Sequence, residues 1–147
     1  MSTTYPPIAE LVPHKPPMIL IDEVLDFAPT LLRARVTLTE ASPFVEDGQV
    51  PTLVSIEYMA QSIAAFAGLT GRRGGEPVRL GYLIACREMT LAVDSLCAGD
   101  ELEVRVMQVW SDEQLGHFDC VVLRRGETVA HAWLSVFQGE LTGTDGK

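Results

Sequence analysis

The segment that most constrains the fold is "TLVSIEYMAQSIAAFAG", residues 52–68, which is apolar on nearly every side of a helical wheel. One apolar face follows the i, i+3, i+4, i+7 spacing of a helix and consists of Ile56, Met59, Ala60, Ile63, Ala64 and Ala67. Much of the opposite side is filled by Leu53, Val54, Ala65 and Phe66. A helix that is apolar all round is expected to be buried. Glu57 and Gln61 need an explanation, because they place polar groups inside this helix.

The segments around this helix alternate between apolar and polar residues, which is typical of strands. Two strands are expected before the helix, at 18–27 and 31–39, and they are expected to pair across "APT". Four more strands are expected after the helix, at 78–93, 100–110, 116–125 and 128–139. The first of these is long enough to bend, and the last two are expected to form a hairpin through "RGE". This order predicts an α+β fold in which one long central helix is wrapped by a mostly antiparallel sheet.

The remaining segments are read as turns and loops of a single domain over residues 1–147, with a core at about 8–139. Residues 5–17 are rich in proline and leave room only for a short helical turn at 7–12. A loop at 40–51 precedes Thr52, which is expected to cap the helix. Glycines and a proline at 70–77 end that helix, and the tail at 140–147 is expected to be frayed.

Composition excludes several classes of function. The formal net charge of −9 argues against broad binding to nucleic acid or to an anionic membrane. No apolar run without charges approaches the ~18 to 20 residues of a membrane span, and no secretory signal is visible. Cys86, Cys97 and Cys120 lack the spacing of a metal site, so free thiols in a reducing cytoplasm are expected, with no metal and no cofactor.

Several motifs in one order resemble a known family. "LVPHKPPMILIDEVLDF", then "SPF…G…P" and "IEYMAQ", resemble the 3-hydroxyacyl–acyl carrier protein dehydratases, and "GYLIACREMTL", "AGDELEV", "GHFDC" and "AHAWLSVFQ" extend the likeness to about residues 8–139. Within that family the chain is most similar to the accessory dehydratase-like proteins of aryl polyene biosynthesis clusters. The resemblance implies a hotdog fold, acyl carrier protein thioesters as substrates, and dimers with active sites at the shared interface.

The sequence departs from the family at one position that matters for catalysis. The family carries a catalytic histidine in a G-H-F-P motif before the helix glutamate, whereas this chain has Gln49 or Pro43 there, depending on the alignment. The "GHF" at His117 lies in a late strand, in the wrong order for that motif. His14 is kept as a candidate base, although packing in the turn before the first strand is the alternative, and His131 is expected to be structural.

Dehydration of a 3-hydroxyacyl thioester needs a base for the proton alpha to the carbonyl, donors for the oxyanion, and an acid for the departing hydroxyl. Glu57 is the candidate acid, because a carboxyl held out of water is more easily kept protonated. The alternative is a buried glutamate satisfied by backbone groups or by a partner subunit. Gln61 is expected to orient the Glu57 carboxyl.

The thioester itself is expected at the start of the helix. The free N–H groups near Leu53 and Val54 are candidate donors for its carbonyl, beside Thr52, where the family usually has a glycine. Gln49 is a candidate hydrogen-bonding group for substrate. Glu46 and Asp47 in the same loop are weaker candidates for the missing base.

Three functions remain open at this point. The chain is a dehydratase that uses Glu57, or a non-catalytic subunit of a histidine-bearing hotdog dehydratase, or, less in keeping with the motifs, an acyl-thioester hydrolase. All three functions require an apolar tunnel for an acyl chain. The candidate lining residues, for which a role in the hydrophobic core is the alternative, are Met59, Ile63, Phe66, Tyr82 and Leu83. Carrier protein is acidic, so its predicted docking patch is Arg72, Arg73 and Arg79. The expected assembly is a homodimer or a hetero-oligomer with another hotdog dehydratase.

Overall fold

The computed structural model describes residues 5–13, 16–73, 81–112 and 114–138; of these, the side chains of Arg73, 81–84 and 138 lie outside the description. The described elements, in chain order, are η1 (Ile8–Glu10), β1 (Glu23–Ala28), β2 (Leu31–Thr37), β3 (Gln49–Pro51), η2 (Thr52–Val54), α1 (Ser55–Arg73), β4 (Gly81–Leu91), β5 (Ser95–Cys97), β6 (Glu101–Ser111), β7 (Leu115–Arg124) and β8 (Glu127–Gln138).

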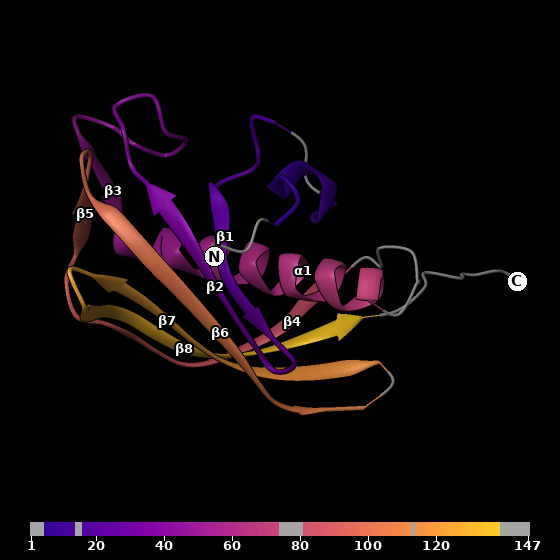
Figure 1. The fold of residues 1–147 in the computed structure, drawn as a ribbon. Coiled ribbons are helices and arrows are strands. Elements are labelled where there is room, and N and C mark those ends of the chain that lie inside the picture. Colours follow the sequence, from indigo (N-terminus) through magenta and orange to yellow (C-terminus); the bar gives the residue numbers. More distant parts are fainter. Residues whose placement is uncertain (1–4, 14–15, 74–80, 113, 139–147) are drawn as a thin grey trace, which may run out of the picture.

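The main sheet has six strands in the order β1-β2-β6-β7-β8-β4, and each neighbouring pair is antiparallel. Figure 1 shows this sheet curving around α1, which lies lengthwise in its hollow. The predicted α+β architecture, with one long helix wrapped by an antiparallel sheet, is confirmed, as are the pairing of the first two strands and the hairpin of the last two. β4 lies at one edge of this sheet.

The core forms between α1 and the concave face of the sheet because the strands alternate. Their inward residues are almost completely buried: Leu32, Ala34, Val36, Leu102, Val104, Val106, Phe118, Cys120, Val122, Ala130, Ala132 and Leu134. Phe66 of α1 joins this layer through edge-to-face contacts with Phe27 and Phe118, both with ring centroids 5.7 Å apart. By length and hydropathy alone Thr52–Arg72 could cross a membrane, but 61% of its most apolar window is buried inside this fold. It is therefore the core helix that the wheel predicts.

The N-terminal segment crosses directly over the backbone of α1. Its proline-rich sequence allows only the 3-10 turn η1, after which Leu11 and Val12 are buried. Gly68 of α1 faces this crossing: a Cβ atom there would overlap the main-chain carbonyl oxygen of Leu11. The absence of a side chain at Gly68 thus sets how closely the arm approaches the helix.

The element boundaries differ from the prediction in four places. β1 begins at Glu23, five residues later than the expected start at residue 18, and the short pair β3 and β5 was not anticipated. The helix opens with the 3-10 turn η2 before the α-helical part. Thr52 makes no side-chain capping hydrogen bond, so the predicted cap is wrong. The bend expected in the strand at 78–93 appears as register shifts in β4.

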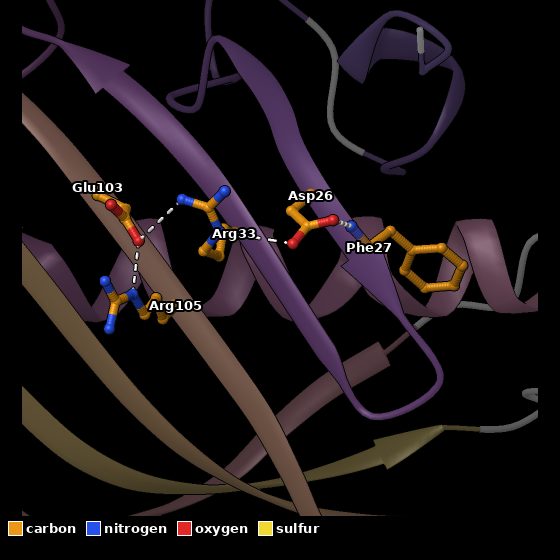
Figure 2. A network of polar contacts seen from close by, with 5 residues as sticks. All are labelled: Asp26, Phe27, Arg33, Glu103 and Arg105. Atoms are coloured by element: carbon orange, nitrogen blue, oxygen red, sulfur yellow. Dashed lines mark hydrogen bonds and ion pairs between the residues drawn. The ribbon is translucent and has the colours of Figure 1, made fainter. Parts of the chain in front are cut away.

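The outer, convex face of the sheet is charged. In Figure 2, Arg33 lies between Asp26 and Glu103, and Arg105 binds the same Glu103 carboxylate. Burial alone would raise the pKa of Glu103, but hydrogen bonds and charge attraction from Arg105 and then Arg33 outweigh it and lower that pKa. This network places charges on the side of the sheet that α1 does not cover, and it ties β1, β2 and β6 together.

Candidate active site

Glu57 lies one turn into the helical segment and its side chain is exposed. The prediction that it is buried within the chain is therefore wrong. The physical reason is that the sheet wraps only one side of α1. The opposite side carries an uncovered stripe of exposed or half-buried residues, namely Leu53, Glu57, Ala60, Ala64 and Ala67. Leu53, at the start of this stripe, is 58% exposed. Glu57 is the charged group of this otherwise small and apolar stripe.

Gln61 does not hold the Glu57 carboxyl among the hydrogen bonds of the described residues. Its side chain is 1% exposed and points to the segment before β1. Oε1 accepts the N–H of Leu20 at 2.7 Å, and Nε2 donates to the carbonyl of Met18 at 2.8 Å. Gln61 is thus a structural residue that satisfies two main-chain groups, and the expected role in orienting Glu57 is replaced by this one.

The start of the helix keeps donors near Glu57. The N–H of Thr52 donates to the carbonyl of Asp94 at 3.1 Å, whereas the N–H groups of Leu53 and Val54 make no hydrogen bond to another element within the described residues. The first N–H groups of a helix have no acceptor within it, so these two are available to a ligand. The Thr52 side chain is fully buried. It therefore does not project from the surface of the helix start, where a family glycine would leave room.

Three buried hydroxyls lie at this end, and two of them, those of Ser55 and Tyr58, were not singled out from the sequence. The side-chain oxygens of Thr52, Ser55 and Tyr58 are buried and have no hydrogen-bond partner within the described part of the chain. Burial raises the pKa of Tyr58 to about 12. The signal was present in the sequence, since three hydroxyl residues at i, i+3 and i+6 are unusual in a helix that is otherwise apolar.

The loop before the helix carries no histidine. Gln49 is exposed on β3, where it pairs with Cys97, and Glu46 bridges back to it. Glu46 and Asp47 are exposed, so the loop places solvated carboxylates near the helix start rather than a buried base. Asp47 has a positive φ of 54°, which belongs to the turn that leads into β3.

The two described histidines lie on the far side of the sheet. His117 of β7 bonds Ser135 at 2.8 Å, and His131 of β8 pairs with Asp119 at 2.6 Å. Their strand neighbours Phe118 and Ala132 are fully buried in the core, so both imidazoles are on the outer face, away from α1. The predictions that the "GHF" histidine is a decoy and that His131 is structural agree with this placement. His14 lies outside the described residues.

The other predicted site residues separate into core and surface. Met59, Ile63 and Phe66 are buried in the core, and the side chains of Tyr82 and Leu83 lie outside the described residues. Arg72 is exposed and forms an ion pair with Glu10 at 3.0 Å. The side chain of Arg73 and all of Arg79 lie outside the described residues. Within that part of the chain no cluster of His, Cys, Asp or Glu could hold a metal ion.

Comparison with known proteins agrees with this architecture. The chain matches the family described as ApeP-like, ApeP dehydratase, over residues 6–144. A 3-hydroxyacyl-[acyl-carrier-protein] dehydratase FabZ from Psychromonas ingrahamii is 25% identical over 140 residues, which covers 91% of this chain and 92% of the relative.

Solved structures share the fold of this chain. The dehydratase heterocomplex ApeI:P from Xenorhabdus doucetiae contains a chain with a TM-score of 0.90 and 27% identity, with 95% of each chain covered. A hypothetical thioesterase with coenzyme A from Streptococcus pneumoniae has a TM-score of 0.63 at 12% identity, over 80% of this chain and 84% of that one, which shows the fold alone.

A long helix in the hollow of a curved antiparallel sheet, with a carboxylate at the start of that helix, defines a hotdog-fold protein of the dehydratase class. The chain belongs to the ApeP-like dehydratase family, which confirms the resemblance seen in the sequence. The first turns of the helical segment carry the exposed Glu57 carboxyl three and four residues after Val54 and Leu53, whose N–H groups begin the helix. This arrangement does not bring a described histidine to the same place.

Proposed function

We propose that this chain forms one half of a dehydratase for 3-hydroxyacyl thioesters on acyl carrier protein, as in fatty-acid or aryl polyene synthesis, with Glu57 as its acid. The observation that carries the proposal is the position of Glu57 on the uncovered stripe of α1 in a member of a dehydratase family. The second half is a hotdog subunit that packs on that stripe and supplies the histidine base that this chain lacks in its loop.

Two observations support a second subunit. The uncovered stripe is apolar apart from Glu57, and Leu53 exposes 58% of its surface at the point where the thioester is expected. Apolar surface of this kind is stabilised when a partner removes it from water. In addition, the relative with a TM-score of 0.90 comes from a complex of two dehydratase chains, ApeI and ApeP. A subunit seated here would also remove Glu57 from water, which favours a protonated carboxyl.

The proposed reaction divides its tasks between the two chains. The partner base takes the proton alpha to the carbonyl, while the N–H groups of Leu53 and Val54 steady the thioester oxygen. The carbon–oxygen bond at the 3 position breaks, and the departing hydroxyl takes the Glu57 proton and leaves as water. The double bond forms between the 2 and 3 carbons, which leaves Glu57 as a carboxylate and the partner base protonated. The base then releases its proton to solvent and Glu57 takes one up, so both groups are restored before the next cycle.

The proposal also covers delivery of the substrate. Arg72, with Arg73 and Arg79, is the proposed docking patch for acidic carrier protein, and free thiols suit a cytoplasmic reaction. Because Arg72 already pairs with Glu10, carrier protein would compete with that carboxylate. Reversing the Arg72 charge should weaken capture of acylated carrier protein, most strongly at low salt. Capture that stays unchanged at low salt would remove Arg72 from the patch.

The decisive experiment measures water loss from a 3-hydroxyacyl carrier protein by this chain, by a histidine-bearing dehydratase subunit, and by the two together. The pair should turn over, and Glu57→Gln should lower its rate by about 10²–10⁴-fold without changing assembly. Glu101→Gln is the matched control, because Glu101 is an exposed carboxylate on β6. An unchanged rate with Glu57→Gln would exclude Glu57 as the acid. Release of free thiol in the same assay would instead indicate a hydrolase.

A further inference from the structure

A pocket lies on the outer face of the sheet, on the opposite side from α1. It has a volume of about 180 Å³, and its side chains come from three strands: Arg87, Glu88, His117, Trp133 and Ser135. Drug-sized ligands occupy pockets of roughly 300–1,000 Å³, so this one suits a small metabolite. It shares no residue with the proposed dehydratase site, and no role in the proposed reaction is assigned to its residues.

The backbone at the pocket is arranged to place two charges on the same face. Adjacent strand residues normally point to opposite faces. The β4–β8 register shifts between Arg87 and Thr90, and Glu88 has a positive φ of 52°. This bulge lets Arg87 and its neighbour Glu88 line one pocket together. A positive φ at a non-glycine residue is costly, and such conformations gather at functional sites.

The two charges are not used by the fold. Within the described part of the chain, neither the Arg87 guanidinium nor the Glu88 carboxylate takes part in an ion pair or a side-chain hydrogen bond. By contrast, Arg33 and Arg105 on the same face of the sheet are both paired with carboxylates. An unpaired cation and an unpaired anion side by side match a ligand that carries both charges.

The rest of the pocket is aromatic and hydrogen-bonding. Trp133 forms one wall, and its indole is held edge-to-face against His131 with ring centroids 5.8 Å apart. Ser135 Oγ lies 2.8 Å from His117 Nδ1, and the His117 ring is in turn 5.0 Å from the ring of Trp110. A flat ligand group can therefore pack on a wall whose position is already fixed.

We propose that this pocket binds a free aromatic α-amino acid. Its carboxylate pairs with Arg87, which presents a planar fork suited to carboxylates. Its ammonium group pairs with Glu88, and its ring packs against Trp133. The pocket is shallow and small, so the expected dissociation constant is about a millimolar. This inference does not rest on the proposed dehydratase function, because Glu57 lies on the other side of the sheet.

The test titrates the full-length chain with L-phenylalanine and follows tryptophan fluorescence, with calorimetry as a second measurement. The chain has only two tryptophans, Trp110 and Trp133, and both are at the pocket or in contact with it. L-phenylalanine should give a saturable change. Phenylpropionate lacks the ammonium group, phenethylamine lacks the carboxylate and glycine lacks the ring, so each should bind at least tenfold more weakly.

Variants identify the two charged contacts. Arg87→Gln should weaken L-phenylalanine at least tenfold while leaving phenethylamine unchanged, and Glu88→Gln should do the same with phenylpropionate as the unchanged ligand. Arg125→Gln and Glu127→Gln are the matched controls, since both residues are exposed, Arg125 in the β7–β8 turn and Glu127 at the start of β8. Thermal unfolding checks that each variant folds. The proposal is overturned if L-phenylalanine gives no saturable signal, or if phenylpropionate binds the wild type equally well.

Discussion

Glu57 and Gln61 lie one helical turn apart on α1, yet Glu57 is exposed whereas Gln61 is 1% exposed and bonded to the main chain of Met18 and Leu20. A turn of α-helix places i and i+4 on neighbouring positions, so the two side chains flank the boundary between the covered and uncovered sides of α1. One polar residue of "IEYMAQ" therefore serves the fold, and the other remains available for chemistry.

Replacing Gln61 by Leu should destabilise the chain by about 2–3 kcal/mol, because two main-chain groups near 18–20 lose their partner. Urea unfolding followed by circular dichroism measures this change. Gln114→Leu is the control, since Gln114 is exposed on a turn. A loss below about 0.5 kcal/mol, the usual range for surface substitutions, would show that water replaces the Gln61 amide at no cost.

Replacing Leu53 by Lys should leave the stability of the isolated chain within about 0.5 kcal/mol, because the side chain is 58% exposed. The same change should weaken binding to a histidine-bearing hotdog subunit at least tenfold, since it places a charge on the uncovered stripe. Analytical ultracentrifugation of mixtures gives the affinity. Met107→Lys, on the outer face and 45% exposed, should not alter it. Equal affinities for both variants would place the interface elsewhere.

Tyr58→Phe should not destabilise the chain, because the hydroxyl it removes is buried and has no hydrogen-bond partner among the described residues. The wild type should also become more sensitive to alkali than the variant. The pKa of Tyr58 is raised to about 12 in the folded chain from an ordinary value of 10, so the neutral phenol stabilises the fold fully below pH 10. This contribution is lost as the pH rises from 10 to 12. The free energies of unfolding of both proteins are measured from pH 10 to pH 12. An equal loss of stability in wild type and variant would contradict the raised pKa of Tyr58.

Glu103→Gln should reduce the change in the free energy of unfolding with pH in the acid range. The folded-state pKa of Glu103 is lowered, so its contribution is present above the ordinary value of 4.5 and lost as the pH falls through the folded value. The difference in stability between wild type and variant should therefore shrink below pH 4.5. Because its partners Arg33 and Arg105 are partly exposed to solvent, the whole effect should stay small. Glu127→Gln, an exposed carboxylate at the start of β8, is the matched control.

Much of the fold could be predicted from local patterns. The alternation in "LLRARVTLT" requires burial on one face of a strand, and the structure buries Leu32, Ala34 and Val36 accordingly. The apolar residues of 52–68 predict a helix, which the structure confirms. The extra strands β3 and β5 escaped because three-residue strands carry too little periodicity to be recognised. Residues 18–22 looked like strand because they are apolar, but Leu20 instead donates to Gln61.

The site was harder to predict because its surroundings are not local. Helical periodicity cannot say how far a sheet wraps, so a helix that looked buried on all sides leaves Glu57 uncovered on one of them. In the same way, Gln61 has partners 41 and 43 residues away in sequence, and no spacing rule indicates them. Family motifs identified Glu57, whereas its exposure on one side of α1 became visible only in the structure.

The contact between Gly68 and the carbonyl of Leu11 gives a criterion for comparing relatives. Because any side chain at this position would collide with main chain rather than with a movable group, a relative with a larger residue there must route its proline-rich arm along another path. A single column of an alignment therefore separates chains that share this arm geometry from chains that share only the helix and sheet.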